Sequence, residues 1–112
     1  MFYQRFEEGK QDPQKECVRS ELLPKDVAPH ISAGLVDIPP GGHNDSNPHF
    51  DKTQIYFVLE GKGSFFLEGK KALDVEAECV VEVPVGVRHM MRADKGTRVR
   101  YIYINDPLKE TA

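Results

Sequence analysis

The chain lacks a basic segment, a long apolar run and more than two cysteines. Its 112 residues include only two cysteines and no tryptophan, and acidic residues outnumber basic ones by 18 to 15. Because there is no basic block or stripe, a nucleic-acid partner is not expected. The longest apolar runs, such as residues 55–59, are far too short to cross a bilayer, so a membrane partner is not expected either.

The two cysteines cannot build a disulfide scaffold, and neither has a CxxC partner. We interpret Cys17 and Cys79 as small strand residues; a thiol that ligates a metal or acts as a nucleophile is the alternative. The first ten residues, MFYQRFEEGK, lack the pattern of a secretory leader. We therefore expect a reduced protein of the cytoplasm.

Helical periodicity is scarce, and strand signals are dense. The nearest helix candidate, residues 22–27, is interrupted by Pro24. Short runs of β-forming residues alternate instead with Gly and Pro turns. These runs predict strands over residues 2–6, 17–23, 31–38, 54–60, 63–68, 79–83, 89–93 and 98–105. About eight to ten such strands indicate an all-β barrel or double-sheet jelly roll, in a single domain of residues 1–112.

The strand predicted over residues 54–60 is apolar on both faces. Successive side chains of a strand point to opposite sides, so Tyr56 and Phe57 belong to different faces, each with further apolar neighbours. A strand of this kind is covered on both sides. We expect one face to line the barrel and the other to be buried against a second copy of the chain, in a homodimer.

A polar stretch, GHNDSNPHFDKTQ (residues 42–54), carries two of the four histidines. Asn47 and His49 are two residues apart and point the same way on an extended segment. His89 follows the turn-forming run PVGVRH. If these segments lie side by side, a divalent ion could be bound by four nitrogen or oxygen donors: Asn47, His49, Gln54 and His89. Each also has an ordinary structural interpretation, as a turn residue, a polar strand start or a half-buried histidine, and the residues alone leave both open.

The same residues resemble the two motifs of the cupin family. The first motif, G-x5-H-x-H-x3,4-E-x6-G, has the spacing of Gly41, Asn47, His49, Gln54 and Gly61. The second, G-x5-P-x-G-x2-H-x3-N, is similar to the stretch that contains residues 84–89. Motif one would then span residues 41–61 and motif two residues 78–93, within a resemblance that covers residues 31–105.

The resemblance implies a small single-domain cupin, a double-stranded β-helix barrel. It also implies a divalent metal ion (Mn, Fe, Zn or Ni) bound by Asn47, His49, Gln54 and His89. Two of these depart from the family pattern, because Asn47 stands at a histidine position and Gln54 at a glutamate position. The set brings no negative charge to the ion, so we expect weaker binding and a more Lewis-acidic ion. His43 is an alternative extra ligand.

Strand parity predicts the lining of the pocket. Met91 lies on the face of His89 and Tyr56 on the face of Gln54, and the last strand carries Tyr101 and Tyr103 on one face with arginines on the other. An interior arginine without a partner is costly, so we expect the tyrosines inward. Arginines turned inward would instead indicate an anionic, carboxylate-bearing substrate.

The function expected from the resemblance is a metal-dependent enzyme acting on a small molecule, of isomerase, lyase or dioxygenase type. The fold does not select the reaction, because one barrel supports many chemistries. The alternatives are a non-catalytic module that binds a small ligand and a structural, dimerising domain with a degenerate site.

Overall fold

Ten strands and one short 3-10 helix form the part of the chain, residues 1–108, that the computed structural model describes. Residues 109–112 of the predicted domain lie outside it. The helix η1 is Phe6–Glu8, and the strands are β1 (Gln11–Pro13), β2 (Val18–Glu21), β3 (Ser32–Ile38), β4 (His43–Ser46), β5 (Lys52–Glu60), β6 (Lys62–Leu67), β7 (Lys70–Glu76), β8 (Val80–Val83), β9 (His89–Ala93) and β10 (Val99–Pro107). Within residues 1–108, no helix is long and apolar enough to span a membrane.

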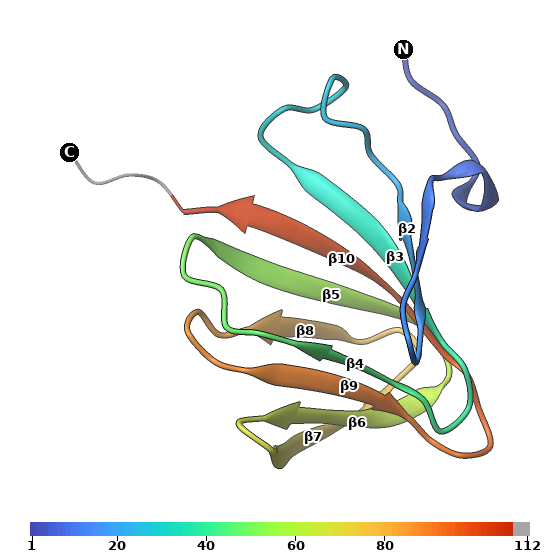
Figure 1. Ribbon diagram of the computed structural model, residues 1–112, viewed down its shortest axis with the longest axis vertical. Helices are drawn as coiled ribbons and strands as arrows, with labels where there is room; N and C mark the ends of the chain where they lie inside the picture. Colours follow the sequence, from blue (N-terminus) through green and yellow to red (C-terminus); the bar gives the residue numbers. More distant parts are fainter. Residues whose placement is uncertain (109–112) are drawn as a thin grey trace.

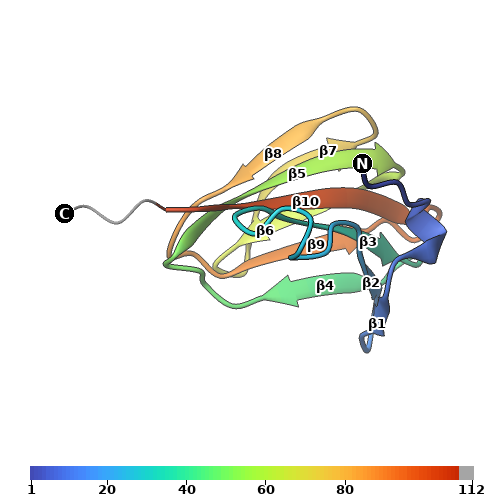
Figure 2. The same cartoon turned by 90° about the horizontal axis from the view of Figure 1, so that it is seen from above.

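The strands form two antiparallel sheets. The first has the order β1-β2-β3-β10-β5-β8 and the second the order β4-β9-β6-β7. Figure 1 shows β3, β10 and β5 running side by side, and Figure 2 shows β4 and β8 on opposite sides of the molecule. From β3 onward the chain passes from one sheet to the other at every connection except the one between β6 and β7, so the two sheets share a common interior. This is the predicted all-β, jelly-roll barrel.

The core lies between the facing sides of the two sheets. Strand β5 alternates along its length, with Tyr56 and Val58 buried and Phe57 exposed. Tyr56 of the first sheet meets Phe65 of the second edge-to-face, with ring centroids 5.9 Å apart. Aromatic pairs in this geometry contribute beyond the area that they bury. Tyr101 completes the contact, its ring centroid 4.5 Å from that of Tyr56.

The strand boundaries agree best with the prediction where apolar residues alternate. The strand over residues 89–93 is found as predicted, whereas residues 2–6 form no strand, and that prediction was wrong. Strands β1, β4 and β7 were not predicted. Most side chains of β7 are exposed, and β4 is largely polar, so neither carries an apolar alternation.

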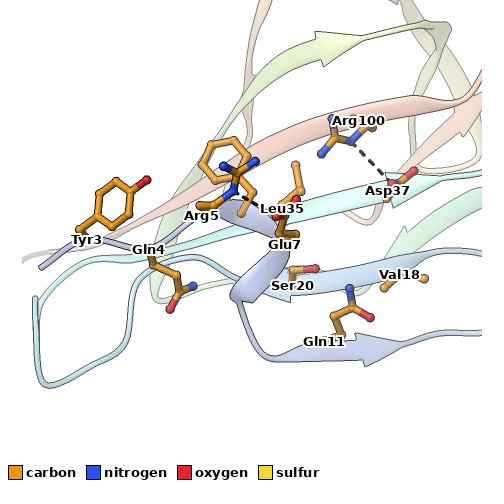
Figure 3. Close-up of a pocket in the computed structure, with 11 residues that line it drawn as sticks. Tyr3, Gln4, Arg5, Glu7, Gln11, Val18, Ser20, Leu35, Asp37 and Arg100 are labelled. Atoms are coloured by element: carbon orange, nitrogen blue, oxygen red, sulfur yellow. Dashed lines mark ion pairs between the residues drawn. The ribbon is translucent and has the colours of Figure 1, made fainter.

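The outer face of the first sheet carries an apolar row across four strands. In the register of the sheet, Ile102 lies between Leu35 and Phe57, and Phe57 lies opposite Val80. The N-terminal segment covers one end of the row, where Leu35 lines a groove of about 680 Å³ with residues around η1. Figure 3 shows this groove, with the ion pair of Asp37 and Arg100 beside it. At the other end, Phe57 and Val80 remain exposed.

Gly34 allows the tyrosine face of β10 to fit against β3. Gly34 lies opposite Tyr103 in the register, and a Cβ atom added to it would overlap the tyrosine ring. Because the register holds Gly34 and Tyr103 opposite each other, the ring or the strand would have to move.

We therefore expect Gly34→Ala to lower the free energy of unfolding by about 1–3 kcal/mol, the usual cost of overpacking. Chemical denaturation of the purified chain measures this. Gly96→Ala is the matched control, because a Cβ there meets nothing within 4 Å. Equal effects of the two substitutions would contradict the close fit of Tyr103 on Gly34.

Candidate functional site

Two loops far apart in the sequence meet at one end of the barrel. Strand β4 pairs with β9 so that Ser46 lies opposite His89. Beyond this pair, the amide of Gly86 donates a hydrogen bond to the carbonyl of His49, at 2.7 Å. The loop that follows β4 and the loop that precedes β9 are therefore joined by their backbones, and the side chains of His49 and His89 face a common region.

His49, Gln54 and His89 form a cluster there. The side chain of His89 is 2% exposed, and its Nε2 lies 3.1 Å from Oε1 of Gln54. The ring centroids of His49 and His89 are 5.4 Å apart. The amide nitrogen of Gln54 donates to Oδ1 of Asn105, at 2.8 Å, and Asn105 donates in turn to Oγ of Ser32. This chain of hydrogen bonds fixes the orientation of the Gln54 amide, with its oxygen toward His89.

The protons of His89 explain what this arrangement can bind. Its Nδ1 lies 3.0 Å from the carbonyl oxygen of Val87, which can only accept, so Nδ1 carries the ring proton. In the neutral imidazole, Nε2 then presents a lone pair to Oε1 of Gln54, and two acceptors face each other. A second proton on the ring, or a metal cation bound by both atoms, would remove the repulsion between these two acceptors. Burial lowers the pKa of His89, against an opposing effect of Val87, and therefore disfavours the proton.

His49 is also an available ligand. Burial lowers the pKa of His49, and the charges of Lys52 and His89 lower it further. Neutral imidazole is the form that binds a metal. A backbone carbonyl on the second ring nitrogen, as His89 has with Val87, is the usual way in which a ligating histidine is oriented. The donors therefore fit a divalent ion chemically, through two imidazole nitrogens and one amide oxygen.

Two further predicted donors are Asn47 and His43. Asn47 follows β4 with an exposed side chain, so its role as a ligand stays a prediction. Asn44 and Ser46 share one face of β4, and His43 lies on the opposite face. Within residues 1–108, no group of three His, Cys, Asp or Glu side chains could hold a metal ion. An ion at this site would therefore depend on the amide of Gln54.

A cavity of about 150 Å³ adjoins the cluster. Of the predicted lining residues, Tyr56, Tyr101 and Tyr103 face it, together with His49 and Gln54. Burial raises the pKa of all three tyrosines, so they are neutral phenols at ordinary pH. Met91 is 1% exposed and packs in the core.

Arg98, which directly precedes β10, and Arg100 within it lie on the outside of the barrel. Arg98 forms an ion pair with Asp37, and Arg100 lies 3.6 Å from the same carboxylate. The tyrosine face of this strand is therefore the one that meets the cavity.

Sequence reasoning missed Arg19 and Asn44, which also line the cavity. Arg19 lies on β2 and donates to Oδ1 of Asn44, at 2.7 Å, and Asn44 donates to the hydroxyl of Tyr101, at 2.8 Å. One signal could have found Arg19: it shares strand parity with Cys17, a residue type that is usually buried. Asn44 is 7% exposed, but nothing in the polar stretch distinguishes it from Asn47.

Comparison with known proteins places the chain in a family. The sequence pattern of the cupin domain matches residues 34–105. A predicted oxalate decarboxylase from Thermotoga maritima has a similar structure, with a TM-score of 0.80 at 20% identity, over 96% of this chain and 100% of that one. The polyketide cyclase RemF from Streptomyces resistomycificus has a TM-score of 0.78 at 19% identity, over 100% of this chain and 82% of that one. The cupin domain of Cnp3 from Schizosaccharomyces pombe has a TM-score of 0.77 at 18% identity, over 93% of this chain and 72% of that one.

No curated protein matches the chain in sequence. At identities of 20% and below, the solved structures show the fold alone. The family rests on the sequence pattern itself, which covers more than half of the chain and includes His49, Gln54 and His89. By that match, the chain belongs to the cupin family.

Proposed function

We propose that the chain is a metal-dependent enzyme that acts on a small molecule inside the barrel, with His49, Gln54 and His89 holding a divalent ion. The observation that supports this most directly is the pair of acceptors, Nε2 of His89 and Oε1 of Gln54, that face each other at 3.1 Å. A cation between them removes a repulsion that the buried site otherwise retains.

The ion would supply Lewis acidity at a carbonyl or at a bound water. Imidazole ligands suit zinc, iron and nickel, and the absence of a carboxylate leaves the ion more electron-poor than an anionic ligand set would. Isomerase, lyase and dioxygenase chemistry all fit such a centre. Asn47 would complete the ligand set only if its loop turned inward. The barrel residues around the ion would bind the substrate and exclude water.

The neutral donor set also favours a second candidate, a non-catalytic module that binds a small ligand. Two imidazoles and an amide bring no negative charge to an ion, so occupancy could be low at the metal concentrations of a cell. In that case the cavity beside Tyr101 and Tyr103 would bind its ligand without a metal.

Metal binding is expected to require both histidines. Untagged protein that is loaded with Zn²⁺ and freed of excess metal should retain about one ion per chain. His49→Ala and His89→Ala should each weaken binding by about 100-fold or more, since even outer partners of ligands contribute about 10–100-fold. Elemental analysis with a zinc-competition titration measures this. His30→Ala, at an exposed position, is the matched control and should retain the ion. Equal occupancy in all four proteins would contradict the proposed site.

Gln54→Glu is expected to strengthen metal binding. The substitution keeps the shape of the side chain and adds the negative charge that the ligand set lacks. We expect affinity to rise on the order of tenfold, about 1.4 kcal/mol. Competition with a fluorescent zinc chelator gives the affinity of each protein. An affinity that falls or does not change would mean that Gln54 does not face the ion.

We also propose that the outer face of the first sheet is buried in a homodimer. The apolar row that begins at Leu35 continues through Ile102 and Phe57 to Val80, but the N-terminal segment covers only its first end. A second copy of the same row would cover the remainder, since two-fold contacts join identical patches. Both thiols of the chain are free, which supports a reducing, cytoplasmic location for this assembly.

Phe57→Glu is expected to convert the dimer to a monomer, because it places a charge in the centre of the row. Light scattering coupled to size exclusion measures the mass of each form. Val27→Glu is the control: Val27 is 42% exposed, close to the 38% of Phe57, but lies in the loop between β2 and β3. A wild-type chain that runs with the mass of a single copy would contradict the dimer.

A further inference from the structure

The cavity beside the histidines is positively charged. Arg19 and Lys52 both line it, and no aspartate or glutamate is among its lining residues in the described part of the chain. Its remaining polar groups are amides, hydroxyls and the imidazole of His49, all neutral. The cavity therefore presents two cations to whatever occupies it.

Arg19 is held in place but not neutralised. Its Nη2 donates to Oδ1 of Asn44, and Asn44 is fixed by the hydroxyl of Tyr101. Its Nε is buried and has no hydrogen-bond partner. Among the ion pairs of residues 1–108, none involves Arg19.

The nearest acidic side chains by sheet position lie outside this cavity. Asp12, opposite Arg19 on β1, and Glu21, on β2, line a separate hollow that shares Arg19 with this cavity. The carboxylate of Asp12 already accepts a hydrogen bond from Gln14. Both residues are exposed, so water screens their effect on the guanidinium.

Arg19 lines the cavity and forms no ion pair within residues 1–108, so an anion in the cavity would supply the counter-charge that the guanidinium lacks. A guanidinium recognises a carboxylate through two parallel charge-assisted hydrogen bonds, which neutral ligands cannot form. Asn44 contributes by fixing the plane of the guanidinium before the ligand arrives. A second cation, Lys52, adds attraction without that directionality.

The size of the cavity limits the ligand. A volume of 150 Å³ corresponds to about five water molecules in the liquid, so the space suits an acid of roughly two to four carbons. The same cavity is lined by His49 and Gln54, so an acid bound to Arg19 would extend toward them. Aromatic walls from Tyr56, Tyr101 and Tyr103 would pack against its carbon chain.

We propose that the barrel cavity binds a small carboxylic acid as its anion, anchored by Arg19 and Lys52. This names the ligand class of the site in the proposed function, but the anchoring by Arg19 does not require the metal. The carboxylate would occupy the end of the cavity at Arg19, and the opposite end of the molecule would lie at the histidine cluster. Arg19 would act as a binding residue for the acid.

The test compares propionate with propionamide, a neutral molecule of nearly the same shape. Chelator-treated, metal-free full-length protein is titrated with each, and binding is followed by calorimetry or by NMR shifts. We expect propionate to bind saturably and at least about tenfold more tightly than propionamide. Arg19→Gln should abolish most of that preference, and Lys52→Gln should weaken propionate binding by about threefold.

Arg92→Gln is the matched control, because Arg92 is an exposed arginine on β9 that lies over the ring of Phe66, away from the cavity. It should bind propionate as the wild type does. Thermal unfolding followed by circular dichroism checks that each variant is folded. If Arg19→Gln does not fold, the preference for propionate over propionamide and its reduction in Lys52→Gln decide the result.

The outcomes separate this proposal from the proposed function. Binding by metal-free protein that depends on Arg19 supports the anion site, even if zinc never binds. Equal binding of propionate and propionamide, or a folded Arg19→Gln that keeps the preference, overturns it. Propionate that binds only after zinc is added, with no effect of Arg19→Gln, also overturns it and leaves the metal centre standing.

Discussion

The pairing of β4 with β9 is the constraint on which the site depends. It places Ser46 opposite His89 and leads the following loop past Gly86, whose amide binds the carbonyl of His49. Without this pairing, the two histidines would belong to unrelated loops. Strand β4 consists of polar residues and buries little apolar surface, so its backbone hydrogen bonds to β9 contribute much of the stability of its position. The geometry of the histidine cluster therefore depends on a polar strand at the edge of the second sheet.

The fold could be predicted from the sequence because its central strands alternate strongly. Strands β3, β5, β9 and β10 each bury one face, and the sequence between them carries Gly and Pro at the turns. The strands that were missed have no such alternation. Strand β7 pairs only with β6, and its side chains are mostly exposed, so apolar periodicity does not reveal it. The aromatic residues 2–6 were misinterpreted as a strand.

The site could be predicted only in part. His49, Gln54 and His89 were identified from motif spacing, and the structure brings them together. The spacing could not show that β4 ends at Ser46, which leaves Asn47 outside the ladder. Alternation within β4 buries Asn44. Arg19 was missed for a different reason: an arginine on a short, mixed strand gives no indication of facing inward until the sheet is assembled.

The tyrosines of the cavity give the protein an optical property that follows from composition and packing together. The chain has no tryptophan and four tyrosines, and three of those four face the cavity. The fourth, Tyr3, is exposed in the N-terminal segment. Intrinsic ultraviolet emission therefore comes mainly from rings within contact range of any bound molecule or ion. The barrel carries its own fluorescent reporter, and occupancy can be followed without a label.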